Sequence, residues 1–359
     1  MSNSFYAVLK DGDLNQGRLV KLDLSNFQNG IVAEGPSIMN HFIGKDLLIK
    51  ISYSTLNYKD ALAITSKKKV VNRLPIILGV DLAGEIVKVQ SKMNTKVAYK
   101  SRFEVGNKVL ATGYRLGEDF NGGLSQYQLV DTSSVIRLDQ FKHKDAEKKS
   151  MMLGTAGLTA MLCVQTILGC RFTKLQKSKY PVAVTGASGG VGLTAVHLLK
   201  SLGYKVVAVS TLTEDKKQLL YKYGVDDFID SKSYITDKKY LKSQRFLGAI
   251  DTLGGEVLSE LMKDTVYYGC IVSTGMVLGD MFTSSVYPLI IRGIRIVGIE
   301  SIMTPMQLRV KAWKSLFDLV DFKLISSQIT EIQLSQTIET AKLLIDNTVS
   351  GRILVNCRR

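Results

Sequence analysis

The 359-residue sequence is poor in the residues that build metal centres and disulfide frameworks. Its four cysteines are far apart and form no Cys-x-x-Cys pair: Cys163, Cys170, Cys270 and Cys357. Its three histidines share no sequence neighbourhood: His41, His143 and His197. The pattern therefore indicates neither a metal site nor a set of disulfides. We interpret His197 as a packing or surface residue.

The sequence also lacks a segment typical of export. Residues Met1 to Lys10 contain no apolar run of signal-peptide length. The longest uncharged run, Ser150 to Cys170, is nominally long enough to cross a bilayer. Three glycines, three threonines and Gln165 make it a poor membrane span, so we predict a buried helix there. We expect a cytoplasmic protein without a membrane partner.

Acidic residues are fewer than basic ones, and the net charge is +15. Such a charge can bind nucleic acid, a membrane surface or a polyanionic small molecule. The basic clusters are scattered and are not interleaved with aromatic residues: Lys67–Lys69, His143–Lys149 and Lys174–Lys179. This favours a lysine-rich surface and no nucleic-acid partner. A phosphorylated substrate carrier, which would use a few of these lysines, stays open.

A glycine turn between residues 181 and 192 is the most informative motif that is present. Val182 to Thr185 favour a buried strand, and Val191 to Leu202 continue as an apolar-faced helix. The small residues between them let the backbone approach a pyrophosphate, which the N–H groups of the helix start can bind. The predicted pyrophosphate contacts are Ser188, Gly189, Gly190 and Val191. The turn therefore predicts a dinucleotide site.

The residues after the second strand indicate which dinucleotide is bound. Lys205 to Ser210 reads as that strand, and an NAD enzyme would place an Asp or Glu at its end. The positions here are Ser210, Thr211 and Leu212, followed by Lys216 and Lys217. Because no carboxylate stands there to repel a 2′-phosphate, we predict that NADPH is bound. Its 2′-phosphate end is expected to contact Ser210, Thr211, Leu212 and Lys216. The alternative is that the lysines only solvate a helix face.

The order of elements predicts an α/β protein with two domains. Before about residue 145 the chain is β-rich, with strands expected at 46–53, 84–90, 105–112 and 125–131. From about 180, strands alternate with helices, with further strands at 227–229, 248–251, 270–273 and 294–298, which predicts a doubly wound parallel sheet. Helices at 307–322 and 335–346 precede a late strand, 352–355, that is expected to return to the first domain.

Several strings in this order resemble the medium-chain dehydrogenase/reductase superfamily: Pro75–Gly84, Val105–Val109, Gly122–Tyr127, Gly154–Ala160 and the glycine turn. More specific strings are similar to its acryloyl-CoA reductase and quinone-oxidoreductase-like branch: Leu56–Leu62, Thr112–Tyr114, Ala249–Gly255 and Ser301–Pro305. The resemblance implies a Rossmann domain at 146–298. It also implies a β-rich, GroES-like catalytic domain at 1–145 and 299–359, and a homodimer.

The resemblance also implies the chemistry. Zinc-dependent relatives carry a metal-binding cysteine near Asn57 to Asp60 and often a four-cysteine lobe, and this chain has neither. It is therefore expected to be a zinc-free reductase that transfers hydride from NADPH to an activated double bond, with acryloyl-CoA reduced to propanoyl-CoA. The alternatives are an NADPH:quinone oxidoreductase or enone reductase, and an NADPH-sensing nucleic-acid-binding protein.

The residues of the site follow by their match to the family strings. Tyr58 is expected beside cofactor and substrate, and Asn57 and Asp60 are expected to hold the loop and the cofactor. Asp60 has a turn or helix-capping role as its alternative. Further cofactor positions implied by the resemblance are Met276, Ile290 and Ser301 at the nicotinamide end and Asp346 on the tail. Thr211-Leu212 departs from the Gly-Arg or Gly-Lys pair of close relatives.

Overall fold

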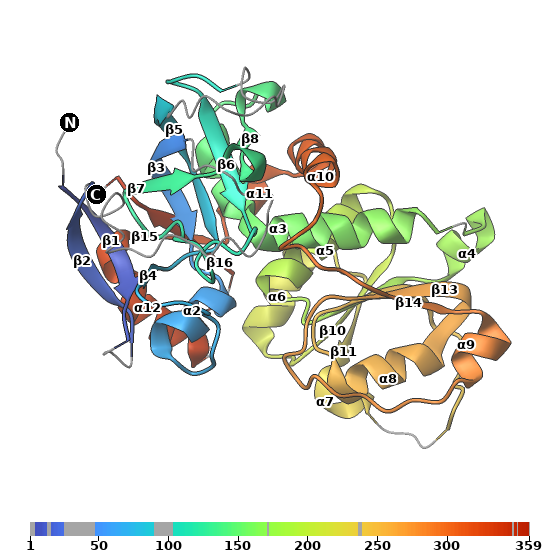
Figure 1. The fold of residues 1–359 in the computed structure, drawn as a ribbon. Coiled ribbons are helices and arrows are strands. Elements are labelled where there is room, and N and C mark those ends of the chain that lie inside the picture. The colour runs from blue at the N-terminus through green and yellow to red at the C-terminus, as the bar shows by residue number, and fades with distance from the viewer. Residues whose placement is uncertain are drawn as a thin grey trace. The chain divides into compact units, whose positions relative to one another are not determined.

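A computed structural model describes residues 4–12, 16–24, 47–89, 103–170, 172–235, 239–346, 348–349 and 351–358. The chain forms two compact units (Figure 1). The first comprises Met1–Thr155, Ile302–Val310 and Asp321–Arg359, and the second comprises Ala156–Ser301 and Lys311–Val320. His41, Asp46 and Gln90, named above, lie outside the described residues. The domain limits predicted from the sequence remain a proposal.

The first unit is built on a mainly antiparallel sheet. The order of its strands is β15 (Ile329–Gln333), β16 (Arg352–Asn356), β3 (Leu47–Thr55), β5 (Asp81–Val89), β6 (Lys108–Thr112) and β8 (Ile136–Arg137), and β7 (Tyr127–Val130) also pairs with β3. A second sheet has the order β2 (Arg18–Asp23), β1 (Ser4–Lys10) and β4 (Ile76–Ile77). The late strand predicted at 352–355 is β16, which pairs with β3, so its return to the first half of the chain is confirmed.

The strands of the first unit alternate buried and exposed side chains. In β3, for example, Ile49 and Ile51 are buried while Lys50 between them is exposed, because successive side chains of a strand point to opposite faces. The helical elements of this unit are α2 (Tyr58–Thr65), α11 (Phe322–Ser326), α12 (Thr337–Ile345), η2 (Thr132–Ser134), η3 (Asp139–Phe141) and η4 (Leu334–Gln336). Helix α2 packs against α12. This contact fixes the helix that begins at Tyr58.

The second unit has one parallel sheet. The order of its strands is β11 (Asp227–Asp230), β10 (Val206–Ser210), β9 (Val182–Thr185), β12 (Phe246–Asp251), β13 (Thr265–Ser273) and β14 (Arg295–Gly298). Every pair in it is parallel. In chain order this is the 3-2-1-4-5-6 arrangement of a Rossmann sheet, and the predicted fold class is confirmed. The order reverses between β9 and β12, which is where such sheets bind their ligands.

Helices connect these parallel strands, as parallel pairing requires. They are α5 (Gly190–Ser201), α6 (Glu214–Lys222), α7 (Ser231–Tyr234), α8 (Gly255–Asp264) and α9 (Tyr287–Arg292), and α4 (Lys174–Lys179) precedes the first strand of the sheet. Helix α5 is the amphipathic helix predicted after the glycine turn, and His197 on it is buried against the ring edge of Tyr223. The packing role predicted for His197 agrees with this contact.

Two long helices, α3 (Ala146–Leu168) and α10 (Met306–Leu319), contribute residues to both units. Within the described residues, α3 is a helix long and apolar enough to cross a membrane, but 72% of its most apolar window is buried inside the structure. This agrees with the buried helix predicted at 150–170. The buried face explains why so apolar a run occurs in a protein with 22% charged residues.

The sequence reading differed from the structure at the C-terminal segments. The helix predicted at 307–322 ends at Leu319, and α11 begins separately because the Asp321 carboxylate accepts hydrogen bonds from two backbone N–H groups at its start. Strand β15 was not predicted. Its sequence, Ile-Thr-Glu-Ile-Gln, buries only Ile332, since it is the outer strand of the sheet. Such an edge strand has a weak hydrophobic pattern.

Gly84 allows β3 and β5 to approach closely. It lies opposite Ile51, and a Cβ atom at this position would be 2.1 Å from the Lys50 carbonyl oxygen. We predict that Gly84→Ala lowers the free energy of unfolding by about 3 kcal/mol, because the methyl group would force the two strands apart. Chemical unfolding followed by circular dichroism measures this. Gly12→Ala is the matched control, since a Cβ at Gly12 meets nothing within 4 Å. Equal unfolding midpoints for the two variants would contradict the assignment.

Candidate functional site

The glycine turn of the second unit forms the connection from β9 to α5. The Gly189 N–H donates to the Gly186 carbonyl at 2.9 Å, and α5 starts at Gly190 without a side-chain cap. A Cβ at Gly192 would be 2.4 Å from the Gly186 oxygen, so only glycine lets the helix start so close to the strand. Gly186 itself has a φ of 56°. The turn thus presents backbone N–H groups at a helix start, which fits a pyrophosphate.

The predicted pyrophosphate and 2′-phosphate residues lie at one edge of the sheet. Ser188 is in the turn, and its hydroxyl oxygen is 3.5 Å from that of Ser210, the last residue of β10. Thr211 and Leu212 follow directly, and Lys216 lies in α6. The structure therefore brings the two predicted phosphate sites together at the carboxyl ends of neighbouring strands.

Two carboxylates near the predicted 2′-phosphate site were not weighed in the sequence analysis. Glu214 and Asp215 form the first turn of α6, and both are exposed. Acidic side chains are favoured at a helix N-terminus by its dipole, which gives them a structural role there. They also place negative charge within two residues of Lys216. Any preference for NADPH must therefore overcome this local negative charge.

A buried polar cluster ties the carboxyl end of β9 to that of β12. The Thr185 hydroxyl donates to the Asp251 carboxylate at 2.7 Å, and the Thr252 N–H donates to the Thr185 hydroxyl at 2.8 Å. Gly254 N–H and Ser273 hydroxyl also donate to Asp251. Burial raises the pKa of Asp251 despite these hydrogen bonds. The cluster fixes the reversal point of the sheet. The segment Ala249–Gly255 contributes to the predicted family resemblance, but no role was predicted for Asp251 within it.

The three residues predicted at the nicotinamide end occupy different places. Met276 is exposed and follows Gly275, whose Cβ position lies 2.2 Å from the Thr252 carbonyl oxygen at the reversal point. The Ser301 hydroxyl accepts a hydrogen bond from the Thr159 hydroxyl at 2.9 Å. Ile290 is on α9 and is exposed.

Helix α9 lies at the other end of the sheet from the glycine turn. Arg292, its last residue, donates to the carbonyls of Lys263 and Thr265, where β13 begins. The amino end of a parallel strand is the edge opposite the ligand-binding crevice. Within the second unit, the structure therefore does not bring Ile290 to the edge that holds the other predicted cofactor residues.

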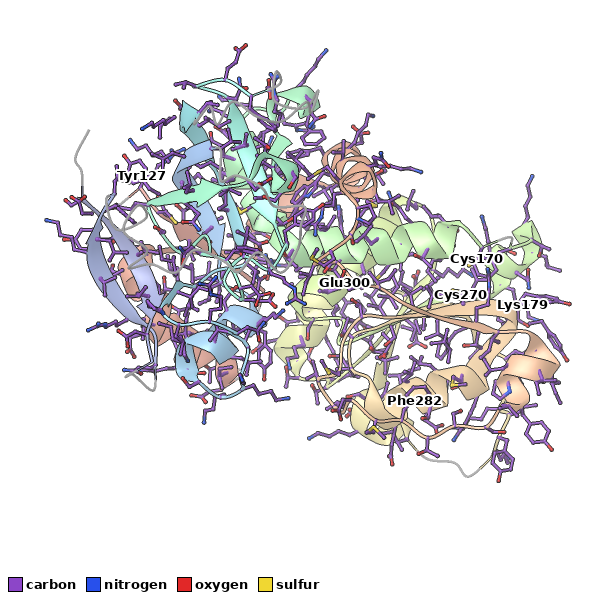
Figure 2. All side chains as sticks on the ribbon, in the orientation of Figure 1. Tyr127, Cys170, Lys179, Cys270, Phe282 and Glu300 are labelled. Atoms are coloured by element: carbon purple, nitrogen blue, oxygen red, sulfur yellow. The ribbon has the colours of Figure 1, made fainter. Side chains whose placement is uncertain are left out.

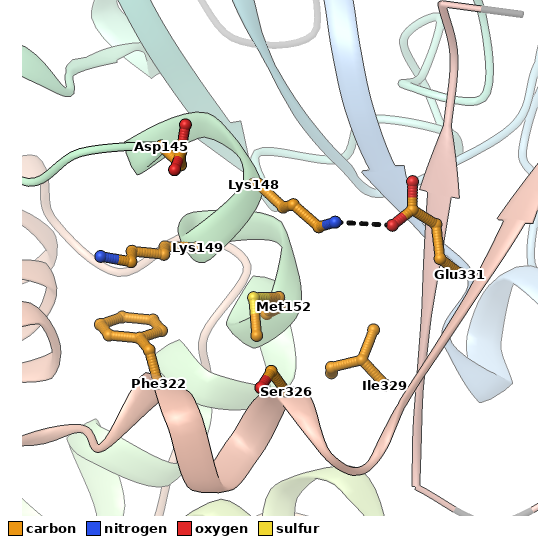
Figure 3. A pocket seen from close by; sticks show the side chains of 8 residues that line it. All are labelled: Asp145, Lys148, Lys149, Met152, Phe322, Ser326, Ile329 and Glu331. Carbon is orange, nitrogen blue, oxygen red and sulfur yellow. Dashed lines mark hydrogen bonds and ion pairs between the residues drawn. The ribbon is translucent and has the colours of Figure 1, made fainter.

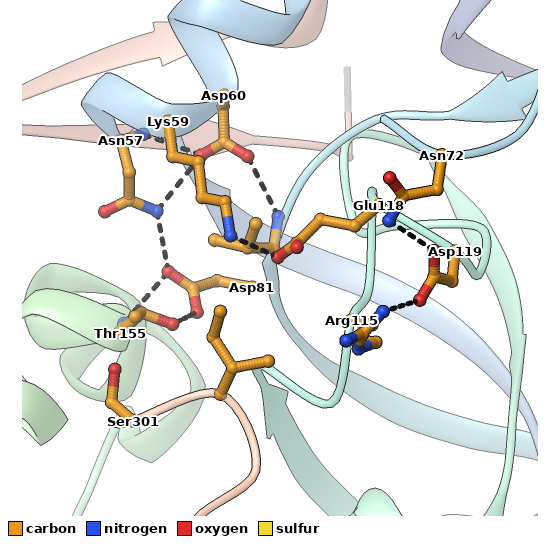
Figure 4. Close-up of polar contacts among 12 residues, drawn as sticks. Asn57, Lys59, Asp60, Asn72, Asp81, Arg115, Glu118, Asp119, Thr155 and Ser301 are labelled. Atoms are coloured by element: carbon orange, nitrogen blue, oxygen red, sulfur yellow. Dashed lines mark hydrogen bonds and ion pairs between the residues drawn. The ribbon is translucent and has the colours of Figure 1, made fainter. Parts of the chain in front are cut away.

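In the first unit, α2 begins in a buried polar network (Figure 4). The Asn57 side-chain amide donates to Asp60 at 3.1 Å and to Asp81 at 3.0 Å, so it lies between two carboxylates. Asp60 also accepts from the Asn57 and Val80 backbone N–H groups. These contacts are those of a helix cap, the alternative that the sequence left open for Asp60. Neither Asp60 nor Asp81 is exposed by more than 3%.

Arg352 completes the network from β16. Its guanidinium donates to the Asn57 side-chain oxygen Oδ1 at 2.7 Å and to the Leu153 backbone carbonyl at 3.1 Å. Burial lowers the pKa of Arg352, and the carboxylates of Asp81 and Asp60 oppose that effect. Sequence reasoning missed this residue, because it lies 295 positions from Asn57. A buried arginine late in the chain carries no local signal of its partners.

Burial raises the pKa of Asp60 to about 7. The neighbouring Asp81 carboxylate acts in the same direction, whereas the hydrogen bonds from Asn57 and Val80 oppose it. Asp81 is itself enclosed by donors, since Thr55 hydroxyl and Thr155 N–H both bind its carboxylate. The start of α2 therefore contains a carboxyl group that takes up a proton near neutral pH.

Tyr58 stands at the open side of this network. It is the first residue of α2, and 51% of it is exposed. Beside it, the Lys59 ammonium pairs with Glu118 at 2.6 Å (Figure 4). Asp346 ends α12, the helix packed against α2, and is exposed. The structure thus fixes the backbone of Tyr58 and leaves its phenol accessible to a ligand.

A separate hollow of about 270 Å³ lies elsewhere in the first unit (Figure 3). Lys148 on its wall pairs with Glu331 at 2.7 Å, and the Lys149 ammonium lies 5.2 Å from the centre of the Phe322 ring. None of its lining residues was predicted as a site residue: Asp145, Lys148, Lys149, Met152, Phe322, Ser326, Ile329 and Glu331. Its two lysines already have partners within the wall. It is therefore not the candidate site.

A metal centre needs several side-chain donors grouped around one point. Among the described parts of the chain, no three His, Cys, Asp or Glu side chains are grouped as ligands for a metal ion. Cys163 is within α3, Cys270 is in β13, and Cys357 follows β16 in the other unit. Cysteines so distributed do not fit a tetrahedral zinc site.

Comparisons with known proteins identify the family. Residues 190–320 match the family described as "Zinc-binding dehydrogenase", and residues 44–140 match "Alcohol dehydrogenase GroES-like domain". The chain is 36% identical over 310 residues to "Probable acrylyl-CoA reductase AcuI" of Escherichia coli (strain K12), covering 86% of this chain and 90% of that protein. The family description names zinc, but the described residues offer no matching ligand set.

Two further relatives cover nearly the whole chain. The yhdH oxidoreductase from Salmonella enterica, solved in complex with NADP, superimposes with a TM-score of 0.84 and is 33% identical, covering 98% of this chain and 99% of that one. YhfP of Bacillus subtilis (strain 168), provisionally named a quinone oxidoreductase, is 35% identical over 86% of this chain and 89% of its own length. Its structure with NAD bound has a TM-score of 0.83, with 29% identity, and covers 99% of this chain and all of that one.

The pKa of Asp60 leads to a prediction about pH. Folded Asp60 binds a proton between about pH 7 and pH 4, where the unfolded carboxyl does not, so wild type gains stability as the pH falls through this window. The Asp60→Asn variant has no carboxyl group at this position, so it does not gain this stability. We expect the difference in unfolding free energy, wild type minus Asp60→Asn, to rise by about 2 kcal/mol from pH 7 to pH 5.5. Urea titrations at both pH values measure it, and a constant difference would mean that Asp60 stays ionised.

Proposed function

This chain belongs to the medium-chain dehydrogenase/reductase superfamily, and we propose that it is a reductase that converts acryloyl-CoA to propanoyl-CoA with NADPH. The observation that carries this proposal is the 36% identity to the E. coli acrylyl-CoA reductase over 86% of the chain. The glycine turn at the reversal point of a Rossmann sheet supports the dinucleotide, and the relative solved with NADP supports its identity.

The second unit supplies the proposed cofactor contacts. Backbone N–H groups from Ser188 to Val191 would bind the pyrophosphate, since the start of α5 has no side-chain cap. Ser210, Thr211 and Lys216 would bind the 2′-phosphate. Met276 and Ser301 are proposed at the nicotinamide end. In the first unit, Tyr58 and Asp346 are proposed as cofactor contacts by their match to the family strings. When bound, the nicotinamide supplies the hydride for the double bond.

The first unit supplies the proposed polar groups for the substrate. Hydride addition to the β-carbon of an acryloyl thioester places negative charge on the thioester oxygen, so a donor near that oxygen lowers the barrier. A tyrosine hydroxyl is protonated at neutral pH and can donate there. Tyr58 is the proposed donor because its ring is exposed at the start of α2. Asn57 and Asp60 act as positioning residues, since their hydrogen bonds are made within the chain.

We propose that the reaction proceeds without zinc. The described His, Cys, Asp and Glu residues fit no metal centre, so no charge on a metal is assigned to the thioester oxygen. An alkene conjugated to a thioester is already electron-poor and accepts hydride at its β-carbon more readily than a simple ketone. Hydrogen-bond donors then suffice to stabilise the enolate.

Quinone reduction is the second candidate, because YhfP of B. subtilis carries a quinone-oxidoreductase name at 35% identity. A quinone, like an enone, has carbon–carbon double bonds that are conjugated to a carbonyl group. Both are therefore electron-poor and accept hydride. Turnover of acryloyl-CoA, crotonyl-CoA, a small enone and a small quinone at equal concentration separates these functions. A kcat/KM highest for the quinone would replace the acyl-CoA assignment and keep the reductase.

We predict that the protein oxidises NADPH with acryloyl-CoA at least about tenfold faster than NADH, equivalent to about 1.4 kcal/mol in transition-state binding. Lys216→Glu is expected to reduce this ratio, because it places a carboxylate beside the 2′-phosphate. Lys222→Glu, in the last turn of the same helix, is the control. Equal rates with both cofactors in wild type would refute the preference and would be explained by Glu214 and Asp215.

We predict that Tyr58→Phe lowers kcat/KM for acryloyl-CoA at least about tenfold, because it removes the hydroxyl donor and retains the ring. Steady-state kinetics with saturating NADPH measure the change. Tyr6→Phe, at another exposed tyrosine of the first unit, is the control and should leave the rate unchanged. If Tyr58→Phe also reacts at the wild-type rate, the phenol has a packing role only.

We propose a homodimer in which the segment Val277–Ile291 contributes to the interface. Apolar side chains in this segment are exposed, among them Val277, Met281 and Val286, and large exposed apolar patches mark association surfaces. Light scattering of the protein as it elutes from a size-exclusion column is expected to give twice the chain mass. The double variant Met281→Asp, Val286→Asp should give one chain mass, whereas Leu175→Asp, at an exposed leucine of α4, should not. A monomeric wild type would refute the dimer.

A further inference from the structure

Two cysteines at the far end of α3 form a pair that the proposed reaction does not use (Figure 2). Cys170 follows α3 by two residues, and Cys270 lies in the middle of β13. Each thiol is the largest influence on the pKa of the other, so the two sulfur atoms are neighbours, and Figure 2 shows both residues beside the end of α3. The Cys170 sulfur also contacts the Thr166 carbonyl oxygen at 3.4 Å, which holds it in the last turn of the helix.

The fold brings these two distant residues together. Gly248 lies opposite Cys270 in the neighbouring strand, and a Cβ at Gly248 would be 3.3 Å from the Ile167 side chain. The absence of that Cβ lets the end of α3 pack directly on the sheet beside Cys270. The turn from Ile167 to Cys170 is closed by the Cys170 N–H, which donates to the Ile167 carbonyl.

We propose that Cys170 and Cys270 form a reversible disulfide when the protein meets a peroxide, with Cys170 as the reacting thiol. Both residues belong to the second unit, so the bond needs no movement of one unit against the other. This inference does not depend on the substrate of the enzyme.

The surroundings of Cys170 favour the reactive thiolate. Arg295 is the partner of Cys270 in β14 and is exposed, whereas Cys270 is buried and Cys170 keeps 7% of its surface accessible. The neighbouring Cys270 thiol and the Arg295 guanidinium together lower the pKa of Cys170 to about 7, against the effect of burial. The pKa of Cys270 is raised by the Cys170 thiol and by burial. Cys170 is thus the nucleophile and Cys270 the resolving thiol.

The other two cysteines are internal controls. Cys163 and Cys357 are almost completely buried, with 0% and 1% exposed, whereas Cys170 retains 7%. Burial raises the pKa of both control thiols to about 12. Neither a thiolate nor an oxidant is available at these positions, so they should stay reduced.

The chemistry balances with one peroxide. The Cys170 thiol first releases its proton to solvent. The thiolate attacks hydrogen peroxide, the O–O bond breaks, a sulfenic acid forms, and the departing hydroxide takes up the released proton to become water. The Cys270 sulfur then attacks the Cys170 sulfur. An S–S bond forms, the S–O bond breaks, and the oxygen leaves as a second water with the Cys270 proton. Two thiols and one peroxide give one disulfide and two waters.

The test uses the full-length protein, reduced, freed of reductant and treated with hydrogen peroxide. After alkylation of the remaining thiols, mass spectrometry of the unreduced digest should find the peptides of Cys170 and Cys270 joined, and dithiothreitol should separate them. Cys163→Ala and Cys357→Ala should retain the cross-link. Cys270→Ala should instead accumulate a sulfenic acid at Cys170, trapped by dimedone at least tenfold above wild type.

Separate, fully alkylated peptides of Cys170 and Cys270 in peroxide-treated wild type would overturn the proposal, as would oxidation of Cys163 before Cys170. A second measurement is independent of the variants. Iodoacetamide should label Cys170 in reduced wild type with a rate that is half-maximal near pH 7, since the thiolate is the reacting form. A rate that rises only above pH 8.5 would also contradict the assignment.

Discussion

The burial of Arg352 near the carboxylates of Asp60 and Asp81 is the constraint on which the site half of the first unit depends. A buried charge is tolerated only when it is paired and hydrogen-bonded, and removal of one partner costs about 3–5 kcal/mol. Arg352 must therefore lie where the Asn57 amide, the Asp81 carboxylate and the backbone carbonyls of α3 converge. This requirement draws the last strand of the chain into a sheet with β3. The position of Tyr58 follows, because its helix starts from the same network.

The second unit also contains a buried charged group, Asp251, but no cation is paired with it among its hydrogen-bond partners in the described residues. Asp251 is fully buried, and its carboxylate is satisfied by the Thr185 hydroxyl and by backbone N–H groups of the turn after β12. These donors come from the two strands that flank the reversal of strand order. The network therefore fixes the spacing of the strand ends from which the glycine turn and the Met276 loop depart. In both units a buried carboxylate holds the backbone around the proposed site, and accessible groups supply the ligand contacts.

The sequence was sufficient to predict the fold class and the glycine turn, because both depend on local signals. The run from Pro181 to Leu202 carries the strand period, the glycines and the helix period within 22 residues of the chain. Long-range partners carry no such signal. Arg352 and Asn57 are 295 positions apart, and nothing near either residue indicates the other. Edge strands such as β15 were missed for a related reason. Only one of its five residues is buried, so its sequence lacks the alternation of apolar and polar residues that predicts a strand. The placement of Ile290 could not be derived either, because a helix after a strand can cover either end of the sheet.

The cofactor preference depends on a short stretch with opposing charges. Ser210 and Thr211 offer hydroxyl donors to a phosphate, and Lys216 offers a charge. Glu214 and Asp215 lie between them, at the helix start where the dipole stabilises acids. A 2′-phosphate competes with these carboxylates for the same positive end of α6, whereas a ribose hydroxyl does not. The relatives include one structure with NADP and one with NAD, in agreement with a discrimination that depends on few residues. In the proposed function, the fold therefore sets where the dinucleotide binds, and the charge balance of these few side chains sets which dinucleotide is preferred.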